Sequence, residues 1–479
     1  MPYGVNERFD FGEPTRPAAA LGRVHFIAIG GSGMSGVAAF LSDLGVTVSG
    51  CDGAESPAVE RLRADGIAVA VGHDPAHLVG VDTVIVSSAI PESNAELAAA
   101  RADGRVVLHR AQALASAMGD DTRVAVAGAN GKTTTSAMIV SALRAAGAHP
   151  SFAIGSELVD LGRNSLRGSG QVFVAEADES DGSFLSYRPH IAVVTNVQPD
   201  HLDFYGDVAH VEAAYAAFAR SVEPGGVLVA FADDAGSARL ASAMRAGGRR
   251  VITYGEAPEA DVRITDVAVA GLTSRAIVTY DGMPLDLTVA APGRHNLVNA
   301  VAALSVGWAG LGLDPVALAA GLAAFPGTRR RFERRGSAAG VDVVDDYAHN
   351  APKVAAVVAG ARAVVAPGAS VRVVFQPHLY SRTRDFAPGF AAGLAGADQV
   401  VLLPVYGARE QPMPGVDSHL IAAELAALGG EAELAADPAD AVRRLVAKAA
   451  AGDLVLTVGA GDVTRLAPLI LAALDGGRE

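Results

Sequence analysis

The stretch VAVAGANGKTTTSAM, residues 124–138, constrains the fold of this chain more than any other. Alternating hydrophobic residues run into Gly128, a short turn follows, and Gly131-Lys132-Thr133 opens a helical pattern. Backbone N–H groups of such a turn surround phosphate oxygens, a lysine reaches the β and γ phosphates, and a threonine hydroxyl binds Mg²⁺. The stretch therefore predicts a strand, a phosphate-binding loop and a helix, with a nucleoside triphosphate as ligand.

The lysine of this loop stands out against the composition. The chain has three lysines, Lys132, Lys353 and Lys448, among 38 basic residues. The compact ammonium of a lysine fits a tight phosphate loop better than the planar fork of an arginine. Two residues separate the glycines, where the common P-loop has four, so the loop is a short variant. The alternative is a strand–turn–helix unit that binds nothing.

Length and composition narrow the class of protein. The 479 residues predict about three domains, and no apolar run reaches the roughly 18 residues that cross a bilayer. A net charge of −14 argues against a nucleic-acid partner, although a local loop can still hold a phosphate. The single cysteine, Cys51, excludes an intramolecular disulfide and a cysteine-rich zinc site. Residues 1–20 predict a flexible tail without an export signal, which favours the cytoplasm.

Strands and helices are expected to alternate in three segments. In residues 21–120 the first strand is expected at 23–29, followed by a glycine turn and a helix. In residues 121–327 the later strands alternate polar and apolar side chains, which predicts a small antiparallel addition to a parallel sheet. Residues 328–479 repeat the alternation. The predicted fold class is α/β, with Rossmann-like first and third domains around a central P-loop-type domain with a mostly parallel sheet.

A second glycine motif, Gly31-x-Gly33-x-x-Gly36, follows the first expected strand. Such glycines let a backbone approach a phosphate at the N-terminus of a helix. Asp52, at the end of the next strand, can accept hydrogen bonds from ribose hydroxyls. A dinucleotide, another diphosphate such as a nucleotide sugar, or tight packing without a ligand would each explain the motif.

Acidic residues and a histidine follow two strands of the second segment. Glu176 ends a strand at the start of AEADESDGSF, where a metal ligand beside a phosphate loop is expected. His201 follows another strand, in TNVQPDHLDFY. An acidic surface loop and a structural histidine are the alternatives.

Polar residues near the second domain junction and in the third segment extend the candidate site. Asn296 and Asn299 share one helical face and suit an adenine edge, although Asn296 could instead cap the helix. Residues 329–331 are three arginines, either a solvated charge run or a phosphate contact at a hinge. The carboxyl edge of the third sheet is expected to carry three further side chains: His349, His378 and Arg382.

Taken together, these motifs occur in the order typical of the Mur ligases, and the chain resembles that family from about residue 22 onward. The motifs are IGGSGMSG, GANGKTTT, AEADESD, DHLDFY, GRHNLVNA, RRRFE, DDYAH, FQPHLYSRT and VGAGDVT. The resemblance implies a three-domain, ATP-dependent ligase of peptidoglycan precursor synthesis. It is strongest to members that join L-alanine to UDP-N-acetylmuramate through an acyl phosphate. The implied partners are these substrates and Mg²⁺, with no nucleic acid or membrane, in a monomer or homodimer.

The resemblance also implies roles for single residues. Lys132, Arg331 and His349 are the implied catalytic residues. The implied ATP-binding residues are Gly128, Ala129, Asn130, Gly131, Lys132, Thr133, Thr134, Asn296, Asn299, Arg331 and Asp346. The implied Mg²⁺ ligands are Thr133, Glu176 and His201. The UDP-sugar would contact Gly31, Ser32, Gly33, Met34, Ser35, Asp52, Ser87 and His109, and the amino acid would contact Tyr347, His349, His378 and Arg382.

Lysine usage and two departures refine the resemblance. Later ligases of the pathway carry a carbamylated lysine in the central domain, and this chain has no lysine between Lys132 and Lys353. The alanine-adding members usually read G-T-H-G-K-T, where this chain has Ala129-Asn130, and Gln198 stands where a Glu is common. They also read H-H-P-T-E where residues 349–353 are HNAPK. A murein-peptide ligase and an inactive nucleotide-binding regulator therefore stay open, and a nicotinamide-dependent oxidoreductase would leave the second phosphate loop unexplained.

Overall fold

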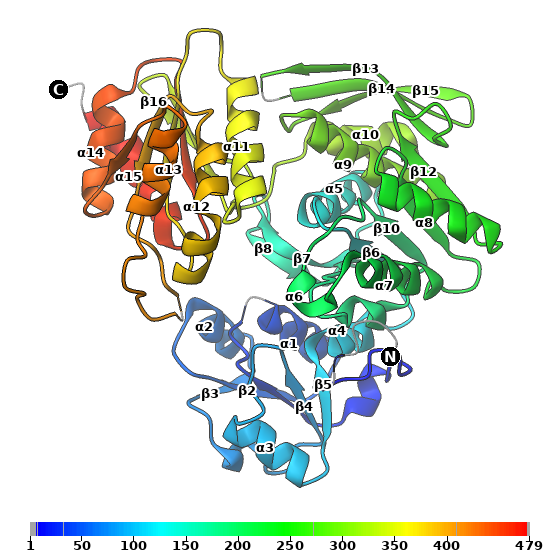
Figure 1. Cartoon of the computed structure of the whole chain (residues 1–479). Helices are drawn as coiled ribbons and strands as arrows, with labels where there is room; N and C mark the ends of the chain where they lie inside the picture. Colours follow the sequence, from blue (N-terminus) through cyan, green and yellow to red (C-terminus); the bar gives the residue numbers. More distant parts are fainter. Residues whose placement is uncertain (1–5, 7, 32, 272, 409, 477–479) are drawn as a thin grey trace.

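The computed structural model describes residues 6, 8–31, 33–271, 273–408 and 410–476. They form three lobes, each built on its own sheet (Figure 1). The first two lobes share one hydrophobic core, in which the Phe40 and Phe173 rings lie 5.1 Å apart. The third lobe has separate cores on the two faces of its sheet. The three-domain α/β prediction is confirmed. No described helix is long and apolar enough to cross a membrane.

The first sheet is fully parallel, in the order β3-β2-β1-β4-β5. Its β1 is shorter than the strand expected at 23–29, because Ala28 turns into the left-handed region and starts the glycine turn. Its strands are β1 (Val24–Ile27), β2 (Val48–Asp52), β3 (Ala68–Val71), β4 (Thr83–Val86) and β5 (Val106–His109). Its helices are η1 (Ala18–Leu21), α1 (Met34–Asp43), α2 (Pro57–Ala64), η2 (Pro75–Leu78), α3 (Ala95–Ala102) and α4 (Arg110–Met118).

The N-terminal segment is not a loose tail throughout. Phe9 and Phe11 are buried, and both rings pack against His109. The Arg188 guanidinium of the central lobe donates to the Gly12 carbonyl at 2.8 Å. Apolar contact therefore orders a stretch whose glycine, proline and charge content suggested flexibility.

The central sheet has the order β15-β14-β13-β12-β11-β10-β6-β9-β7-β8. The antiparallel addition is confirmed in β13–β15, and β8 adds a second antiparallel pair with β7. Its strands are β6 (Thr122–Ala127), β7 (Ser151–Leu158), β8 (Arg163–Leu166), β9 (Val172–Glu176), β10 (Ile191–Val194), β11 (Val227–Phe231), β12 (Val251–Gly255), β13 (Val262–Ala270), β14 (Thr273–Tyr280) and β15 (Met283–Val289). Its helices are α5 (Lys132–Ala145), η3 (Ser183–Tyr187), α6 (Leu202–Tyr205), α7 (Val208–Arg220), α8 (Ala235–Ala246), α9 (Arg294–Ser305), η4 (Val306–Gly310) and α10 (Pro315–Ala323).

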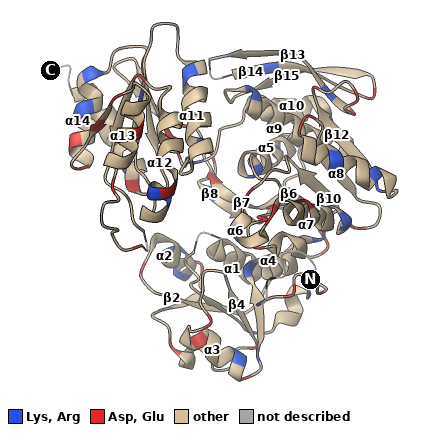
Figure 2. Cartoon of the chain, viewed as in Figure 1, with Lys and Arg blue, Asp and Glu red and all other residues tan. Residues whose placement is uncertain are grey.

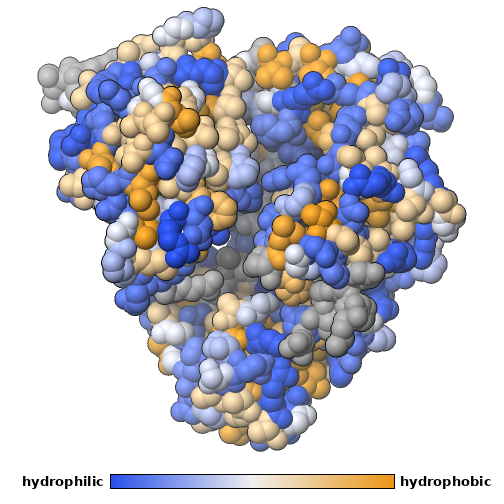
Figure 3. Space-filling view, in the orientation of Figure 1, coloured by the Kyte–Doolittle hydropathy of each residue, from blue (hydrophilic) through white to orange (hydrophobic). Residues whose placement is uncertain are grey.

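The third sheet has the order β16-β17-β21-β18-β19-β20 and is parallel except for its edge strand β16. Its strands are β16 (Glu333–Ala338), β17 (Val341–Asp346), β18 (Val371–Phe375), β19 (Gln399–Leu402), β20 (Ala432–Leu434) and β21 (Leu454–Val458). Its helices are α11 (Ala351–Val364), α12 (Tyr380–Leu394), α13 (His419–Ala427), α14 (Pro438–Lys448), η5 (Asp462–Arg465) and α15 (Leu466–Gly476). Figure 3 shows the surface hollowed between this lobe and the central one.

Candidate active site

The phosphate loop joins the end of β6 to the start of α5, as predicted. Gly131 is the N-cap of α5 and has a φ of 87°, and Gly128 has a φ of 141°. A side chain on Gly128 would overlap Thr195 Oγ1, and one on Gly131 would lie 2.7 Å from Asn299 Oδ1. Both glycines are therefore required by backbone conformation and by space.

Lys132 is held inside this loop by a carboxylate. Its Nζ donates to the Gly128 carbonyl at 2.7 Å and to Glu179 Oε1 at 2.8 Å. Burial lowers the pKa of Lys132, but Glu179, Asp178 and Glu176 outweigh burial and leave that pKa above its usual value. The lysine is therefore a permanent cation at the point where a phosphate would lie.

Glu176 and Thr133 meet beside the loop, as the magnesium prediction requires. Thr133 Oγ1 donates to Glu176 Oε1 at 3.0 Å, and the Gly155 N–H donates to the second carboxylate oxygen at 2.6 Å. Figure 2 shows acidic residues gathered beside β6. These oxygen atoms are the donor type that Mg²⁺ prefers.

The structure adds Asp178 and Glu179 to the residues that the sequence singled out. One donor atom from each, with one from His201, lie within 4.8 Å of one another. His201 Nε2 lies 4.0 Å from Glu179 Oε1. Burial raises the pKa of Glu179, and its Oε2 is buried without a hydrogen-bond partner among the described residues. An orphaned carboxylate oxygen of this kind fits a cation site.

Replacing Glu179 with glutamine should lower the turnover rate about tenfold or more, because the buried negative charge next to the cation site is lost. Steady-state kinetics at varied Mg²⁺ would measure this, and we expect a higher Mg²⁺ requirement in Glu179→Gln. Glu212→Gln is the matched control, since Glu212 makes an exposed ion pair with Arg239. Equal Mg²⁺ curves for the two variants would contradict a role for Glu179.

The asparagine pair lies on α9, next to the phosphate loop. Asn299 Oδ1 accepts from Thr135 Oγ1 at 3.2 Å, and Asn299 Nδ2 donates to Asn296 Oδ1 at 3.4 Å. Asn296 Nδ2 donates to the Pro292 carbonyl at 2.8 Å, and the helix N-cap is Gly293. Asn296 is thus not the cap of α9, and adenine contact stays a prediction for the pair.

Two arginines of the run at the domain junction, Arg330 and Arg331, make different contacts. Arg330 Nη2 donates to the carbonyls of Gly459 and Gly461 at 2.5 and 3.2 Å, which ties it to the third lobe. The Arg331 guanidinium lies 5.6 Å from the Tyr347 ring centroid. Arg331 is therefore placed near the expected amino-acid residues, and its phosphate contact stays a prediction.

Asp346 ends β17 in a buried position. Its two oxygens accept from the backbone N–H groups of Phe332 at 2.7 Å and Ala348 at 2.8 Å. Burial raises the pKa of Asp346 to about 6, because these hydrogen bonds and Arg331 only partly offset the loss of water. The predicted ribose contact would use oxygens that already hold the residue before β16 and the loop between β17 and α11.

The four residues expected at the amino acid lie together at the edge of the third sheet. The His349 ring lies 5.0 Å from Tyr347 and 6.1 Å from His378, and Arg382 Nη1 donates to the His349 carbonyl at 3.2 Å. Lys353 lies in the first turn of α11, and burial lowers its pKa, with the like charges of Arg331 and Lys132 adding to the effect. Lys353, which stands where the alanine-adding members have a Glu, is therefore close enough to Lys132 of the phosphate loop for the two charges to interact.

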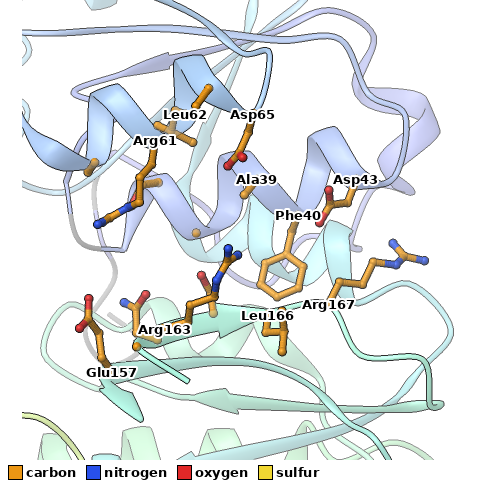
Figure 4. Close-up of a pocket in the computed structure, with 17 residues that line it drawn as sticks. Ala39, Phe40, Asp43, Arg61, Leu62, Asp65, Glu157, Arg163, Leu166 and Arg167 are labelled. Carbon is orange, nitrogen blue, oxygen red and sulfur yellow. The ribbon is translucent and has the colours of Figure 1, made fainter. Parts of the chain in front are cut away.

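Two of the cavities between the first and central lobes are lined by residues of the first glycine motif. One of about 140 Å³ is lined by Gly33, Arg110 and Tyr187 and reaches Glu176. A second, of about 230 Å³, lies between α1, α2 and β8, where Phe40 points toward Leu166 (Figure 4). A side chain on Gly33 would overlap the Arg110 guanidinium. The first glycine motif thus opens toward the same site as the phosphate loop.

The remaining first-domain candidates differ in their surroundings. Asp52 Oδ2 accepts from the Gly30 N–H at 2.8 Å and so shapes the glycine turn. His109 is buried, its Nδ1 accepts from the Ala111 N–H at 3.2 Å, and burial lowers its pKa to about 4. Met34 begins α1 and is also buried, and Gly31, Ser35 and Ser87 are at least partly accessible. Ser32 lies outside the described residues. Contact of any of these with a nucleotide sugar stays a prediction.

Comparison with known proteins matches three successive parts of the chain to one family. Residues 23–122 match the Mur ligase family catalytic domain, residues 126–307 the Mur ligase middle domain and residues 330–461 the Mur ligase glutamate ligase domain. The UDP-N-acetylmuramate–L-alanine ligase of Kineococcus radiotolerans is 52% identical over 95% of this chain and 97% of its own. That of Acidothermus cellulolyticus is 49% identical over 96% of each.

Solved structures show the same architecture. The UDP-N-acetylmuramate–alanine ligase of Thermotoga maritima is 27% identical, with a TM-score of 0.79 over 95% of this chain and 100% of that chain. A murein peptide ligase from Psychrobacter arcticus is 22% identical, with a TM-score of 0.67 over 95% of this chain and 98% of that chain. The second likeness concerns the fold alone.

Proposed function

This chain belongs to the Mur ligase family, and on that premise we propose that it joins L-alanine to the lactyl carboxylate of UDP-N-acetylmuramate at the expense of ATP. The observation that carries the proposal is the cavity that links the first glycine turn at Gly33 to Glu176, beside the phosphate loop. A nucleotide sugar and a triphosphate can meet there. ATP and nucleotide sugars are made in the cytoplasm, so we place the reaction there. We propose that the active form is a monomer or a homodimer.

The identity of relatives favours this reaction over the alternatives. Relatives at 52% and 49% identity carry the alanine ligase name, whereas the murein peptide ligase shares 22%. The phosphate-loop lysine, its threonine and the acidic cluster are all present and in contact, which speaks against an inactive regulator.

The chemistry proceeds in two steps. The lactyl carboxylate attacks the γ-phosphorus of ATP, and ADP leaves, giving an acyl phosphate. The alanine amine then attacks the acyl carbon, and inorganic phosphate leaves as the amide forms. Lys132 and Arg331 neutralise the developing negative charge, and most of the acceleration comes from positioning, as is usual in phosphoryl transfer.

Thr133, Glu176 and His201 would hold Mg²⁺, with Glu179 next to them. The observed donors fit, since Thr133 and Glu176 already share a hydrogen bond and one buried Glu179 oxygen has no hydrogen-bond partner in the described part of the chain. When bound, the ion supplies positive charge to the phosphates.

His349 is the candidate proton acceptor for the incoming amine. Its Nδ1 lies 2.9 Å from the Tyr347 carbonyl and must donate to it, which leaves Nε2 with a free lone pair. Burial lowers the pKa of His349 to about 4, so the ring is neutral above that pH. The amino-acid side of the site thus holds a base that needs no prior deprotonation.

The pH profile should reflect this low pKa. At saturating ATP, so that Asp346 does not limit binding, kcat/KM calculated for the free-amine form of alanine should stay level on the acid side down to pH 5 and fall only near pH 4. Using the free amine removes the protonation of the substrate itself from the profile. His349→Gln should lose about 100-fold in kcat, since general bases contribute at least that factor. His419→Ala, at an exposed histidine, is the control. A fall near pH 6.5 in the wild-type kcat/KM for the free amine would contradict the assignment.

Phosphate release from ATP tests the function directly. We expect release to require both UDP-N-acetylmuramate and L-alanine, with the amide product confirmed by mass spectrometry. Release with a tripeptide but not with L-alanine would assign the chain to the peptide ligases. Absence of turnover with any amino acid or peptide would support a regulator.

A further inference from the structure

A second group of metal-ligand side chains lies in the first lobe. His25 on β1, Cys51 on β2, His77 on η2 and Glu96 on α3 each place a donor atom within 4.8 Å of the others. The core around Cys51 combines residues of η2 and α3, whereas α1 and α4 pack into the core shared with the central lobe. Figure 1 shows α3 at the end of the first lobe that points away from the other two. The group therefore lies in a different core from that behind the ligase cavities, although Cys51 directly precedes Asp52.

Burial of these groups needs an explanation. The side chains of His25 and Glu96 are 2% and 0% exposed, and Cys51 is fully buried. A buried carboxylate is costly unless cations or hydrogen-bond donors surround it. None of the four residues lines the cavities described between the first and central lobes. The ligase reaction therefore gives no reason for their presence.

A hydrogen bond at Nδ1 orients the His25 ring so that its other nitrogen faces Glu96. His25 Nδ1 lies 3.0 Å from Ser49 Oγ, and the Ser49 hydroxyl is 3.3 Å from the Val24 carbonyl that accepts from it. His25 Nε2 has no hydrogen-bond partner among the described residues, and Glu96 Oε1 lies 3.6 Å from it. Metal-binding histidines are oriented in this way, by a hydrogen bond from the other ring nitrogen.

The spacing of the donors fits a small tetrahedral cation. Ligand atoms that surround zinc at 2.0–2.3 Å lie about 3.3–3.8 Å from one another. The separation of His25 Nε2 and Glu96 Oε1 falls in this range and exceeds a hydrogen bond. Shorter contacts, 2.6 Å from His77 Nδ1 and 2.8 Å from Cys51 Sγ to Glu96, are hydrogen bonds that a metal would replace.

We propose that His25, Cys51, His77 and Glu96 form a structural site for a divalent metal of the zinc class. Two imidazoles, one thiolate and one carboxylate are the ligands that zinc takes, and four protein ligands would close the site to chemistry. The ion would join β1, β2, η2 and α3 at one point. His73, 3.2 Å from Cys51 Sγ, lies beside the ligands.

Metal binding would release a proton. Burial raises the pKa of Cys51, which leaves its thiol protonated and donating to Glu96. Because the thiolate is the ligand, affinity should fall as pH is lowered.

Cobalt is a suitable probe because the chain has one cysteine. The full chain, stripped with a chelator and kept in excess Mg²⁺ to fill the ligase site, would be titrated with Co²⁺. We expect a thiolate-to-cobalt charge-transfer band and visible bands of tetrahedral strength, saturating at one equivalent and abolished by Zn²⁺. Such a charge-transfer band can arise only from Cys51. Its absence from the wild-type spectrum would overturn the proposal without any variant.

Variants then test the other ligands. Cys51→Ala should lose the charge-transfer band, and His77→Ala and Ser49→Ala should bind Co²⁺ at least about tenfold more weakly. His419→Ala, at an exposed histidine outside the group, should bind as the wild type does. Wild-type affinity in His77→Ala would refute the proposed ligand set. The binding assay does not depend on turnover, so its failure is distinguishable from failure of the proposed ligase function.

Discussion

Lys132→Ala should lose about a thousandfold or more of the ATP- and alanine-dependent turnover. The lysine is the cation of the phosphate loop, 2.8 Å from Glu179 and 2.7 Å from the Gly128 carbonyl. Contacts that neutralise a transferring phosphoryl group contribute effects of this size. Lys132→Arg should also be strongly impaired, because the guanidinium is too large for a loop whose glycines admit no side chain. Phosphate release under saturating substrates would measure both variants.

Lys448→Ala is the matched control for this experiment. Its ammonium forms an exposed ion pair with Glu433 on the third lobe, so turnover should be unchanged. Near-ultraviolet circular dichroism would establish that Lys132→Ala is folded, since the change leaves Glu179 buried without its partner. Turnover within tenfold of the wild type in a folded Lys132→Ala would refute the assigned role.

Gly128→Ala should reduce turnover about 100-fold or more and destabilise the protein by about 1–3 kcal/mol. The added methyl group would overlap Thr195 Oγ1, which donates to the Asn130 carbonyl at 2.6 Å and so holds the loop in place. The φ of 141° is also unfavourable for alanine. ATP binding, turnover and thermal unfolding would be measured together.

Gly147→Ala is the control that separates the effect of backbone strain from the effect of a steric overlap with a neighbouring side chain. Gly147 follows α5, has a φ of 76°, and an added Cβ there would meet nothing within 4 Å. This control should lose about 1 kcal/mol of stability from backbone strain and keep its turnover. Equal turnover of the two alanine variants would show that the contact with Thr195 does not matter.

Much of the central lobe could be predicted because its signals are local. The run into Gly128 and the lysine after Gly131 predicted β6, the loop and α5, all of which the structure contains. Polar–apolar alternation predicted the antiparallel β13–β15, since one face of these strands is solvated.

In the third lobe, the edge strand β16 was not foreseen, because its sequence, ERRGSA, has no alternating apolar pattern.

The parts of the site that depend on side-chain direction could not be predicted from sequence. Glu176 was singled out because it ends β9, yet Glu179 is the carboxylate paired with Lys132. The chain after β9 is irregular, so spacing gives no direction for its side chains. The packing of Phe9 and Phe11 against His109 could not be foreseen, because these residues are distant in sequence, and the contact of His109 with the nucleotide sugar stays a prediction. The group around Cys51 comes from four elements, and no short motif joins them.

The shared core of the first two lobes has a consequence for motion. With the Phe40 and Phe173 rings in contact, separating these lobes would expose apolar surface to water. The third lobe has its own cores and is linked to the central sheet by the backbone pair between Leu158 and Thr328. Rotation of the third lobe as a rigid body relative to the first two therefore exposes less apolar surface than separation of the first two would. The nucleotide sugar would then bind to a part of the protein that does not move, and rotation of the third lobe would bring the amino acid toward it.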